Sequence, residues 1–206
     1  MSATSDIVDL AIIGGGPVGL FGAFYAGMRQ MSVRIIDSLD ILGGQLMTLY
    51  PEKYIYDAPG FPRILAKDLS ANLVKQGLQF GATTHLGEQV RQLLFDSHTR
   101  LYTIVTAKAA HVCRAILVAA GVGAFQPKTL PLANASEYEG NGLEYFVRHL
   151  SDYADKHVLI IGGGDSAVDW ANALCGSAAS VTLIHRRDQF RAHEESVTRR
   201  EARYVS

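Results

Sequence analysis

Residues 8–19 of the chain read VDLAIIGGGPVG, and 148 residues later residues 156–167 read KHVLIIGGGDSA. In each copy an apolar run is followed by a glycine-rich turn, an alanine-rich segment and a second β-branched run, at residues 33–36 or 181–184. The order strand, turn, helix, strand is typical of parallel α/β structure. The sequence therefore predicts an α/β fold with two doubly wound, Rossmann-like units.

The composition is that of an ordinary folded protein. Of the 206 residues, 48% are hydrophobic and 19% are charged. A formal net charge of −1 argues against a general nucleic-acid binder, which usually carries a basic surplus. Residues 10–28 lack charges over nearly the length of a membrane span, but Pro17 and several glycines interrupt them. We therefore expect neither a membrane-spanning segment nor a secretory signal.

The two cysteines, Cys113 and Cys175, are 62 residues apart, and the sequence contains no Cys-x-x-Cys. The chain therefore offers neither a dithiol redox centre nor a multi-cysteine zinc site, and we predict no metal centre. This cysteine usage fits a reducing compartment, so we expect a cytoplasmic protein.

The segment between the two copies has a different pattern. Residues 67–80 have apolar positions at helical spacing, and residues 83–118 contain short apolar runs typical of strands. We expect the latter to form an inserted antiparallel sheet before a final parallel strand. A domain boundary near residues 121–127 gives a first domain at 1–122 and a second at 123–206. The charged residues 199–203 predict an exposed helix.

The first glycine loop has the pattern Gly14-x-Gly16-x-x-Gly19, and Asp37 follows 23 residues after Gly14. In a dinucleotide site the first glycine permits a tight turn, the second admits a pyrophosphate and the third lets helix and strand pack closely. The helix N-terminus offers N–H groups to the phosphates, and Asp37 would accept hydrogen bonds from a ribose. A plain tight turn is the alternative, but the flanking strand, helix and acid favour a dinucleotide.

The second loop, Gly162-x-Gly164-x-x-Ala167, has no acid at the matching position. The residue 23 positions after Gly162 is His185, and Arg186, Arg187 and Arg191 follow it. Arginines there would bind a ribose 2′-phosphate through charge-assisted hydrogen bonds, whereas a carboxylate would repel it. A solvated basic turn is the alternative. Because the motif predicts a ribose contact at this position, we expect NADP(H) in the second unit and, by contrast, FAD in the first.

Further motifs extend the pattern over most of the chain. They are Gly-Gly-Gly-Pro-Val-Gly at 14–19, Gly-Gly-Gln-Leu at 43–46, LYPEKYIYD at 49–57, Gly-Phe-Pro at 60–62, Gly-Gly-Gly-Asp-Ser-Ala at 162–167 and His-Arg-Arg at 185–187. In these motifs the chain resembles the thioredoxin-reductase-like flavoproteins, and among them the thioredoxin-reductase-type ferredoxin (flavodoxin)–NADP reductases. The resemblance covers nearly all of residues 7–195.

The resemblance implies a set of cofactor contacts. Gln45 would hydrogen-bond the flavin region, Tyr50 would stack on the isoalloxazine ring, and Val90 and Phe125 would line the adenine and ring environments. The full set for FAD is Gly14, Gly16, Pro17, Gly19, Asp37, Gln45, Tyr50, Val90 and Phe125. The full set for NADPH is Gly162, Gly164, Asp165, Ser166, His185, Arg186, Arg187 and Arg191. No side chain is assigned as a catalytic acid, base or nucleophile, because the flavin carries the chemistry.

The missing cysteine pair distinguishes between subfamilies. In thioredoxin reductases a redox-active Cys-x-x-Cys lies shortly before the second glycine loop, but residues 145–149 here read YFVRH. The resemblance thus implies a reductase that passes electrons from NADPH through FAD directly to ferredoxin or flavodoxin, and it implies a homodimer. The alternatives are a relative of the disulfide reductases and a truncated, non-catalytic nucleotide-binding module.

The resemblance also bears on length. It implies a family of about 330 residues in which the chain returns, after the NADPH unit, to complete the FAD domain. That return is absent from these 206 residues, and the NADPH domain is incomplete. We therefore expect either a fragment of a longer reductase or a shortened relative.

Overall fold

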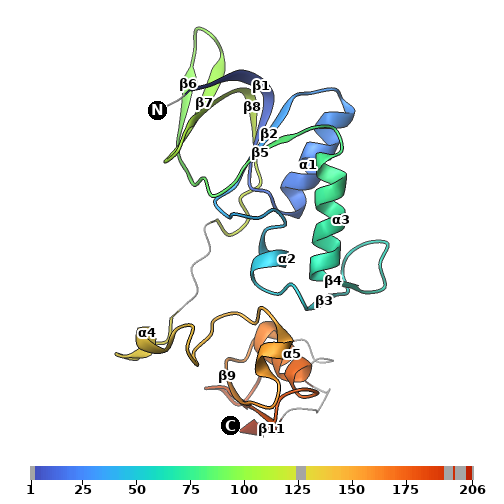
Figure 1. Ribbon diagram of the computed structural model, residues 1–206, viewed down its shortest axis with the longest axis vertical. Helices are drawn as coiled ribbons and strands as arrows, with labels where there is room; N and C mark the ends of the chain where they lie inside the picture. Colours follow the sequence, from blue (N-terminus) through green and yellow to red (C-terminus); the bar gives the residue numbers. More distant parts are fainter. Residues whose placement is uncertain (1–2, 124–128, 193–196, 198–202, 206) are drawn as a thin grey trace. The chain divides into compact units, whose positions relative to one another are not determined.

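The computed structural model describes residues 3–123, 129–192, 197 and 203–205. Internal contacts divide the chain into two units, Met1–Tyr145 and Phe146–Ser206. Among the described residues no helix is both long enough and apolar enough to cross a membrane. Figure 1 shows the elements of each unit.

The first unit is built on one six-stranded sheet with the order β5-β2-β1-β8-β7-β6. The first four of these strands run parallel, and β6 and β7 complete an antiparallel meander with β8. The strands are β1 (Ala3–Ile13), β2 (Val33–Ile36), β5 (Thr83–His85), β6 (Val90–Asp96), β7 (Leu101–Thr106) and β8 (Ala110–Val118).

The predicted antiparallel strands are present, and they continue the parallel sheet. Strand β8 has two edges and uses both, because it pairs in parallel with β1 and antiparallel with β7. Ile36 of β2 and Ile104 of β7 belong to the same buried cluster, although β1 and β8 lie between β2 and β7 in the sheet. The sheet therefore curves, and the meander covers the face that the helices leave open.

Helices α1 (Pro17–Met28) and α3 (Ala66–Leu78) lie side by side on the other face of this sheet (Figure 1). Ile12 and Ile35 from the strands pack with Leu20 and Ala23 from α1, and all four are buried. The helix predicted at residues 67–80 is thus confirmed as α3. Burial of these side chains supplies the main stabilisation of the unit.

The first unit also contains short elements outside this core. They are α2 (Gln45–Thr48), the two-stranded β3 (Tyr54–Ile55) and β4 (Ile64–Leu65), and α4 (Ala135–Tyr138). Helix α2 begins directly after Gly43 and Gly44, both of which have positive φ. These glycines let the chain turn sharply behind the first glycine loop.

The second unit repeats the first strand–turn–helix–strand segment. Strands β9 (His157–Ile161) and β10 (Ser180–Ile184) pair in parallel, α5 (Asp165–Leu174) connects them, and a 3₁₀ turn, η1 (Leu150–Tyr153), precedes them. Val168 and Leu174 of α5 pack on Val181 and Leu183 of β10. The parallel α/β fold predicted for both copies is confirmed.

Two further sequence-based expectations, a domain boundary and a C-terminal helix, have different outcomes. The contacts divide the chain after Tyr145, whereas the boundary between nucleotide domains that we predicted at 122/123 stays a prediction. The helix expected at 199–203 is wrong at its described end, because Arg203 begins strand β11 (Arg203–Val205), which pairs in parallel with β10. Pairing with an open strand edge outweighs the local helical preference of these residues; the rest of that segment lies outside the described residues.

Candidate nucleotide-binding loops

The first glycine loop leaves the carboxyl end of β1 and leads into α1. A side chain at Gly14, which has φ +108°, would strike the backbone carbonyl of Ala119 at the end of β8. A side chain at Gly19 would strike the carbonyl oxygen of Gly14. The first and third glycines therefore make the tight turn and the close approach of helix and strand possible.

Gly16, the second glycine, faces a more open space. A Cβ atom there would meet only the Cα atom of Gly44, at 3.8 Å. Gly16 is also the N-cap of α1, and no side chain caps this helix. The backbone is thus accessible at a helix N-terminus, which is the geometry that a phosphate group requires. Pro17 occupies the first helical position, where its missing N–H costs little.

Asp37 lies directly behind this turn. Its Oδ2 atom accepts a hydrogen bond of 2.5 Å from the Gly15 N–H, and its Oδ1 atom accepts one of 2.9 Å from the Leu39 N–H. The residue is 8% exposed. Asp37 therefore fixes the shape of the glycine loop. A carboxylate oxygen can accept more than one hydrogen bond, so its predicted contact with a ribose remains compatible with these bonds.

The other residues predicted to contact FAD have mixed placements. The Gln45 side chain, at the start of α2, lies near Gly121, because a Cβ atom at Gly121 would be 3.5 Å from its Nε2 atom. Val90 begins β6 and packs partly on the buried cluster of the curved sheet. Tyr50 is half-buried and has the Lys53 ammonium 5.8 Å from its ring centre. Phe125 lies outside the described residues, and all of these contacts stay predictions.

The second loop repeats two backbone hydrogen bonds of the first at equivalent positions. Gly14 N–H donates to Ile36 O and Gly162 N–H donates to Ile184 O, at 2.8 and 2.9 Å. The carbonyl of Gly15 accepts from the Gly43 N–H at 2.9 Å, and that of Gly163 accepts from the Arg191 N–H at 2.7 Å. Both N-caps, Gly16 and Gly164, have the same extended backbone. Each pair differs by the same 148 residues that separate the sequence motifs.

His185 takes the place of Asp37 in the second copy. A Cβ atom at Gly163 would overlap the imidazole ring of His185, and this ring stacks on Phe190 with centres 5.6 Å apart. His185 Nε2 is buried and has no hydrogen-bond partner among the described residues. His185 thus supports the turn by packing, as Asp37 does by hydrogen bonding.

The basic residues of the second loop are exposed. Arg186, Arg187 and Arg191 lie after β10, and the Arg191 backbone holds this segment against the glycine turn. Asp165 and Ser166 are the first exposed residues of α5, and Gly164 has no atom within 4 Å of the position of a Cβ. The structure therefore brings the cationic residues, the helix N-terminus and the open glycine together within the second unit.

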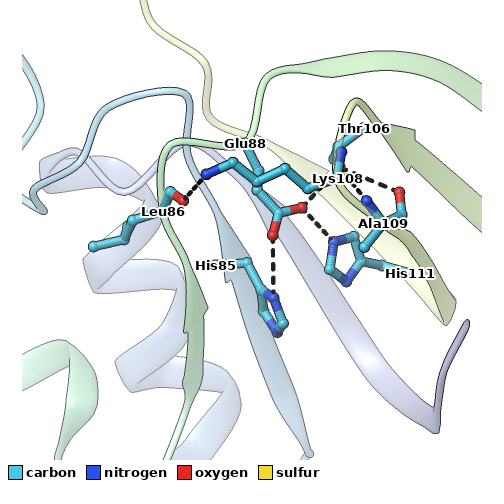
Figure 2. Close-up of polar contacts among 7 residues, drawn as sticks. All are labelled: His85, Leu86, Glu88, Thr106, Lys108, Ala109 and His111. Atoms are coloured by element: carbon cyan, nitrogen blue, oxygen red, sulfur yellow. Dashed lines mark hydrogen bonds and ion pairs between the residues drawn. The ribbon is translucent and has the colours of Figure 1, made fainter. Parts of the chain in front are cut away.

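One cluster was missed by the reasoning from sequence. Glu88 Oε2 accepts a hydrogen bond from Thr106 Oγ1 at 2.7 Å and lies 2.9 Å from His111 Nε2, while Glu88 Oε1 lies 3.5 Å from His85 Nδ1 (Figure 2). His111 is fully buried and Glu88 is 7% exposed. The available signal was His111, a polar residue at an inward position of an apolar strand.

The electrostatics of this cluster favour an ionised Glu88 and a neutral His85. Burial tends to raise the pKa of Glu88, but the hydrogen bonds from His111 and Thr106 outweigh it and hold that pKa below its usual value. Burial lowers the pKa of His85, and the neighbouring His111 and Arg34 lower it further. The cluster is therefore a buried, hydrogen-bonded carboxylate–imidazole network.

Fold and loops together define an α/β protein with two Rossmann-like units. The model of the family described as pyridine nucleotide-disulphide oxidoreductase matches residues 8–205. The chain belongs to this family.

Curated relatives match nearly the whole chain. A ferredoxin–NADP reductase of Halalkalibacterium halodurans is 54% identical over 197 residues, which cover 96% of this chain and 59% of the relative. Ferredoxin–NADP reductase 2 of Bacillus subtilis is 52% identical with the same coverage. The chain thus spans 59% of the length of these relatives.

Solved structures share the fold. The crystal structure of Lactococcus lactis thioredoxin reductase matches with a TM-score of 0.82 and 26% identity, over 96% of this chain and 64% of that one. Thioredoxin reductase of T. acidophilum matches with a TM-score of 0.83 and 23% identity, over 96% and 63%. The chain therefore has the fold of the thioredoxin-reductase-like flavoproteins that its motifs resemble.

Proposed function

We propose that the chain carries the FAD-binding and NADPH-binding units of an oxidoreductase that passes electrons from NADPH through FAD to ferredoxin or flavodoxin. The observation that carries this proposal is the repeated loop with opposite chemistry at one position. Asp37 offers a carboxylate to a ribose, whereas His185 is followed by Arg186 and Arg187, which suit a 2′-phosphate. Identical turns with unlike neighbours favour two different dinucleotides.

The described residues fit both cofactors. Gly16 and Gly164 leave room at uncapped helix N-termini for a pyrophosphate, and Gln45 lies near the end of β8, where a flavin would lie in the first unit. When bound, the flavin would accept a hydride from NADPH and release electrons to the carrier. The protein would bind and orient the two cofactors. We assign residues 1–122 to the FAD domain and 123–206 to the NADPH domain.

The carrier is proposed from two observations. The matching curated relatives are named ferredoxin–NADP reductases, and this chain contains no Cys-x-x-Cys through which electrons could pass to a disulfide substrate. Neither cysteine forms a disulfide, and Cys113 is buried, with its pKa raised by burial. Electron transfer directly from flavin to a protein carrier fits these features better than disulfide reduction.

We also propose a homodimer that works in the cytoplasm. Helix α1 presents an exposed apolar stripe of Val18, Phe21, Tyr25 and Met28, which a second copy could cover. The absence of disulfides fits a reducing compartment. Sedimentation of wild type and Phe21→Glu tests the first part: we expect a dimer that the charge converts to a monomer, and a monomeric wild type refutes it.

The electron-transfer proposal is tested by mixing the purified chain with FAD and adding NADPH under anaerobic conditions. We expect the flavin absorbance at about 450 nm to bleach on addition of NADPH and to recover when oxidised ferredoxin or flavodoxin is added. A disulfide substrate should not restore it. Recovery with a disulfide but not with either carrier, or flavin that binds without being reduced, would contradict the proposal.

A further inference from the structure

The buried cluster of His85, Glu88, Thr106 and His111 lies directly behind Asp37. The Asp37 N–H donates a hydrogen bond of 3.0 Å to the carbonyl of His85, and the Glu88 N–H donates one of 2.8 Å to the carbonyl of Asp37. Both main-chain groups of Asp37 are therefore held by the two residues whose side chains meet in the cluster. The Gly87 N–H, between them, holds the carbonyl of Leu39 at 2.9 Å.

The side chains keep this connection in place from three strands. His85 ends β5, Thr106 ends β7 and His111 lies in β8, and Glu88 joins them from the segment between β5 and β6 (Figure 2). The rings of His85 and His111 are in edge contact, with centres 4.5 Å apart. A carboxylate that is bonded to side chains from separate strands fixes the loop at its base, because rotation of Glu88 would break several bonds at once.

The charged groups around Glu88 come from every neighbouring element. Arg34 of β2 is 5% exposed and acts electrostatically on His85, while its Nη2 atom donates to the carbonyl of Asp6. Lys108 donates to the carbonyl of Leu86 at 3.4 Å, and both Lys108 Nζ and the carboxylate of Asp40 lie near Gly87. With two cations nearby, a proton on His85 adds a third positive charge beside Glu88 and Arg34.

A divalent metal is the competing occupant, because the three ligand atoms lie within 4.8 Å of one another. Two features oppose it. His111 Nδ1 is buried without a hydrogen-bond partner among the described residues, whereas a metal-ligating histidine ordinarily donates its second N–H. The nearby guanidinium of Arg34 would also repel a cation. A hydrogen-bonded support accounts better for the geometry.

We propose that Glu88 is a positioning residue for the first nucleotide site: the cluster of His85, Glu88, Thr106 and His111 holds Asp37 against the glycine loop, and acid weakens this hold. The inference rests on the proposed role of the first loop as a nucleotide site. The folded protein lowers the pKa of His85, so acid below the ordinary histidine pKa is needed to place a proton there, where it faces Arg34. The pKa of Glu88 is lowered too, so Glu88 loses its charge only at a still lower pH. Asp37 then loses its fixed backbone, and the bond from Gly15 weakens.

Amide hydrogen exchange, followed by NMR, tests this support without a cofactor. The Gly15 N–H reports the bond to Asp37 directly. At pH 7 we expect Glu88→Gln to lower its protection factor about ten-fold, and the protection factor of the wild type to fall progressively as the pH is lowered from 7 toward 5. Asp96→Asn is the matched control, because Asp96 ends β6 and bonds His98 and Thr99 in the adjoining turn, and it should leave Gly15 unchanged.

Two comparisons make the result decisive. Amides of Ile12 and Ile35 in the core should keep their protection in Glu88→Gln; an equal loss there would show general destabilisation and overturn the proposal, as would unchanged protection of Gly15. If Glu88→Gln does not fold, Thr106→Ser should preserve the protection of Gly15 and Thr106→Val should reduce it, since only serine keeps the hydroxyl that bonds Glu88.

Titration with ADP, which carries the adenosine and pyrophosphate of FAD, separates the two proposals. We expect Glu88→Gln to weaken ADP binding about ten-fold relative to wild type and to Asp96→Asn. Failure of the wild type to bind ADP would refute the nucleotide site, while the exchange of Gly15 would still decide the role of Glu88. Equal ADP affinity in wild type and Glu88→Gln would refute that role alone.

Discussion

Single residues give the two loops their different chemistry. Asp37 and His185 occupy the same position behind matching glycine turns, but one is a carboxylate that accepts two backbone N–H groups and the other is an aromatic ring packed on Gly163. The carboxylate also suits a ribose, whereas the ring is followed in the sequence by the exposed Arg186 and Arg187. One position thus separates the two proposed specificities.

Glycine substitutions should separate folding from binding. Gly19→Ala places a methyl group against the carbonyl of Gly14, so we expect it to lower the free energy of unfolding by about 1–3 kcal/mol. Gly164→Ala meets no atom within 4 Å, so it should leave the stability nearly unchanged while weakening NADP(H) binding. Denaturant titration and calorimetric binding measure these effects. A destabilised Gly164→Ala would contradict the open geometry of the second loop.

The arginines after β10 should discriminate between NADPH and NADH. We expect the double variant Arg186→Ala with Arg187→Ala to weaken NADPH binding by roughly 10- to 100-fold, because hydrogen bonds to a charged phosphate are lost. Binding of NADH, which has no 2′-phosphate, should change little. The measurement is the dissociation constant of each nucleotide. Equal losses of affinity for both nucleotides would show that these arginines do not bind the 2′-phosphate.

The cluster at Glu88 should make stability fall on acidification. The folded protein holds the pKa of His85 below 6.5, the ordinary value that His85 has in the unfolded chain. Between the folded and the unfolded pKa, the unfolded chain binds a proton at His85 that the folded chain does not bind. The free energy of unfolding therefore drops as the pH falls below 6.5. The lowered pKa of Glu88 adds a second loss below 4.5. Melting curves from pH 7.5 to 5 should show the first loss, and His85→Gln should flatten it. If the stability of His85→Gln falls with pH as steeply as that of the wild type, the loss of stability comes from other groups.

At the level of helices and strands, the parallel units were predictable because their signal is local. An apolar run, a glycine turn and a second apolar run lie within about thirty residues, and the alternation of types fixes the connection. The final parallel strand was expected, and β8 takes that place beside β1. The joining of β6 and β7 to the same sheet was not visible, because no local pattern reports that the second edge of β8 pairs as well.

The same limit explains the missed cluster. His85, Glu88, Thr106 and His111 are spread over 27 residues and three strands, and they meet only because the sheet curves. Sequence shows polar residues there, but partners at long range cannot be assigned without the register. The roles of Gly14 and Gly19 were predictable, in contrast, because a recurring spacing carries them.

The contact of α1 with α3 should reverse the usual effect of a glycine in a helix. Replacing a helical glycine by alanine ordinarily stabilises a protein by up to about 1 kcal/mol. A Cβ atom at Gly77 would lie 2.9 Å from the carbonyl oxygen of Leu20, so we expect Gly77→Ala to destabilise by about 1–3 kcal/mol instead. Lys75→Ala, at an exposed position of the same helix, is the control and should change little. Denaturant unfolding gives the sign, and a stabilised Gly77→Ala would contradict the close approach.

For the molecule as a whole, the internal repeat is the organising feature. Two units with matching strands, turns and helix N-caps differ in the residues behind and after the turn. Such a repeat, with different residues at the proposed specificity position, would give one chain two nucleotide sites of different preference. This arrangement suits a protein that transfers electrons from one bound dinucleotide to another.

The most direct test of this account is calorimetric titration of the chain with FAD and with NADP⁺, in wild type, Gly16→Val and Gly164→Val. The account predicts one site for each ligand without competition between them. Gly16→Val should lose FAD and keep NADP⁺, and Gly164→Val should do the opposite, because each valine fills the space left for one pyrophosphate. Competition of the two ligands for one site, or loss of both ligands in a single variant that remains folded, would contradict it.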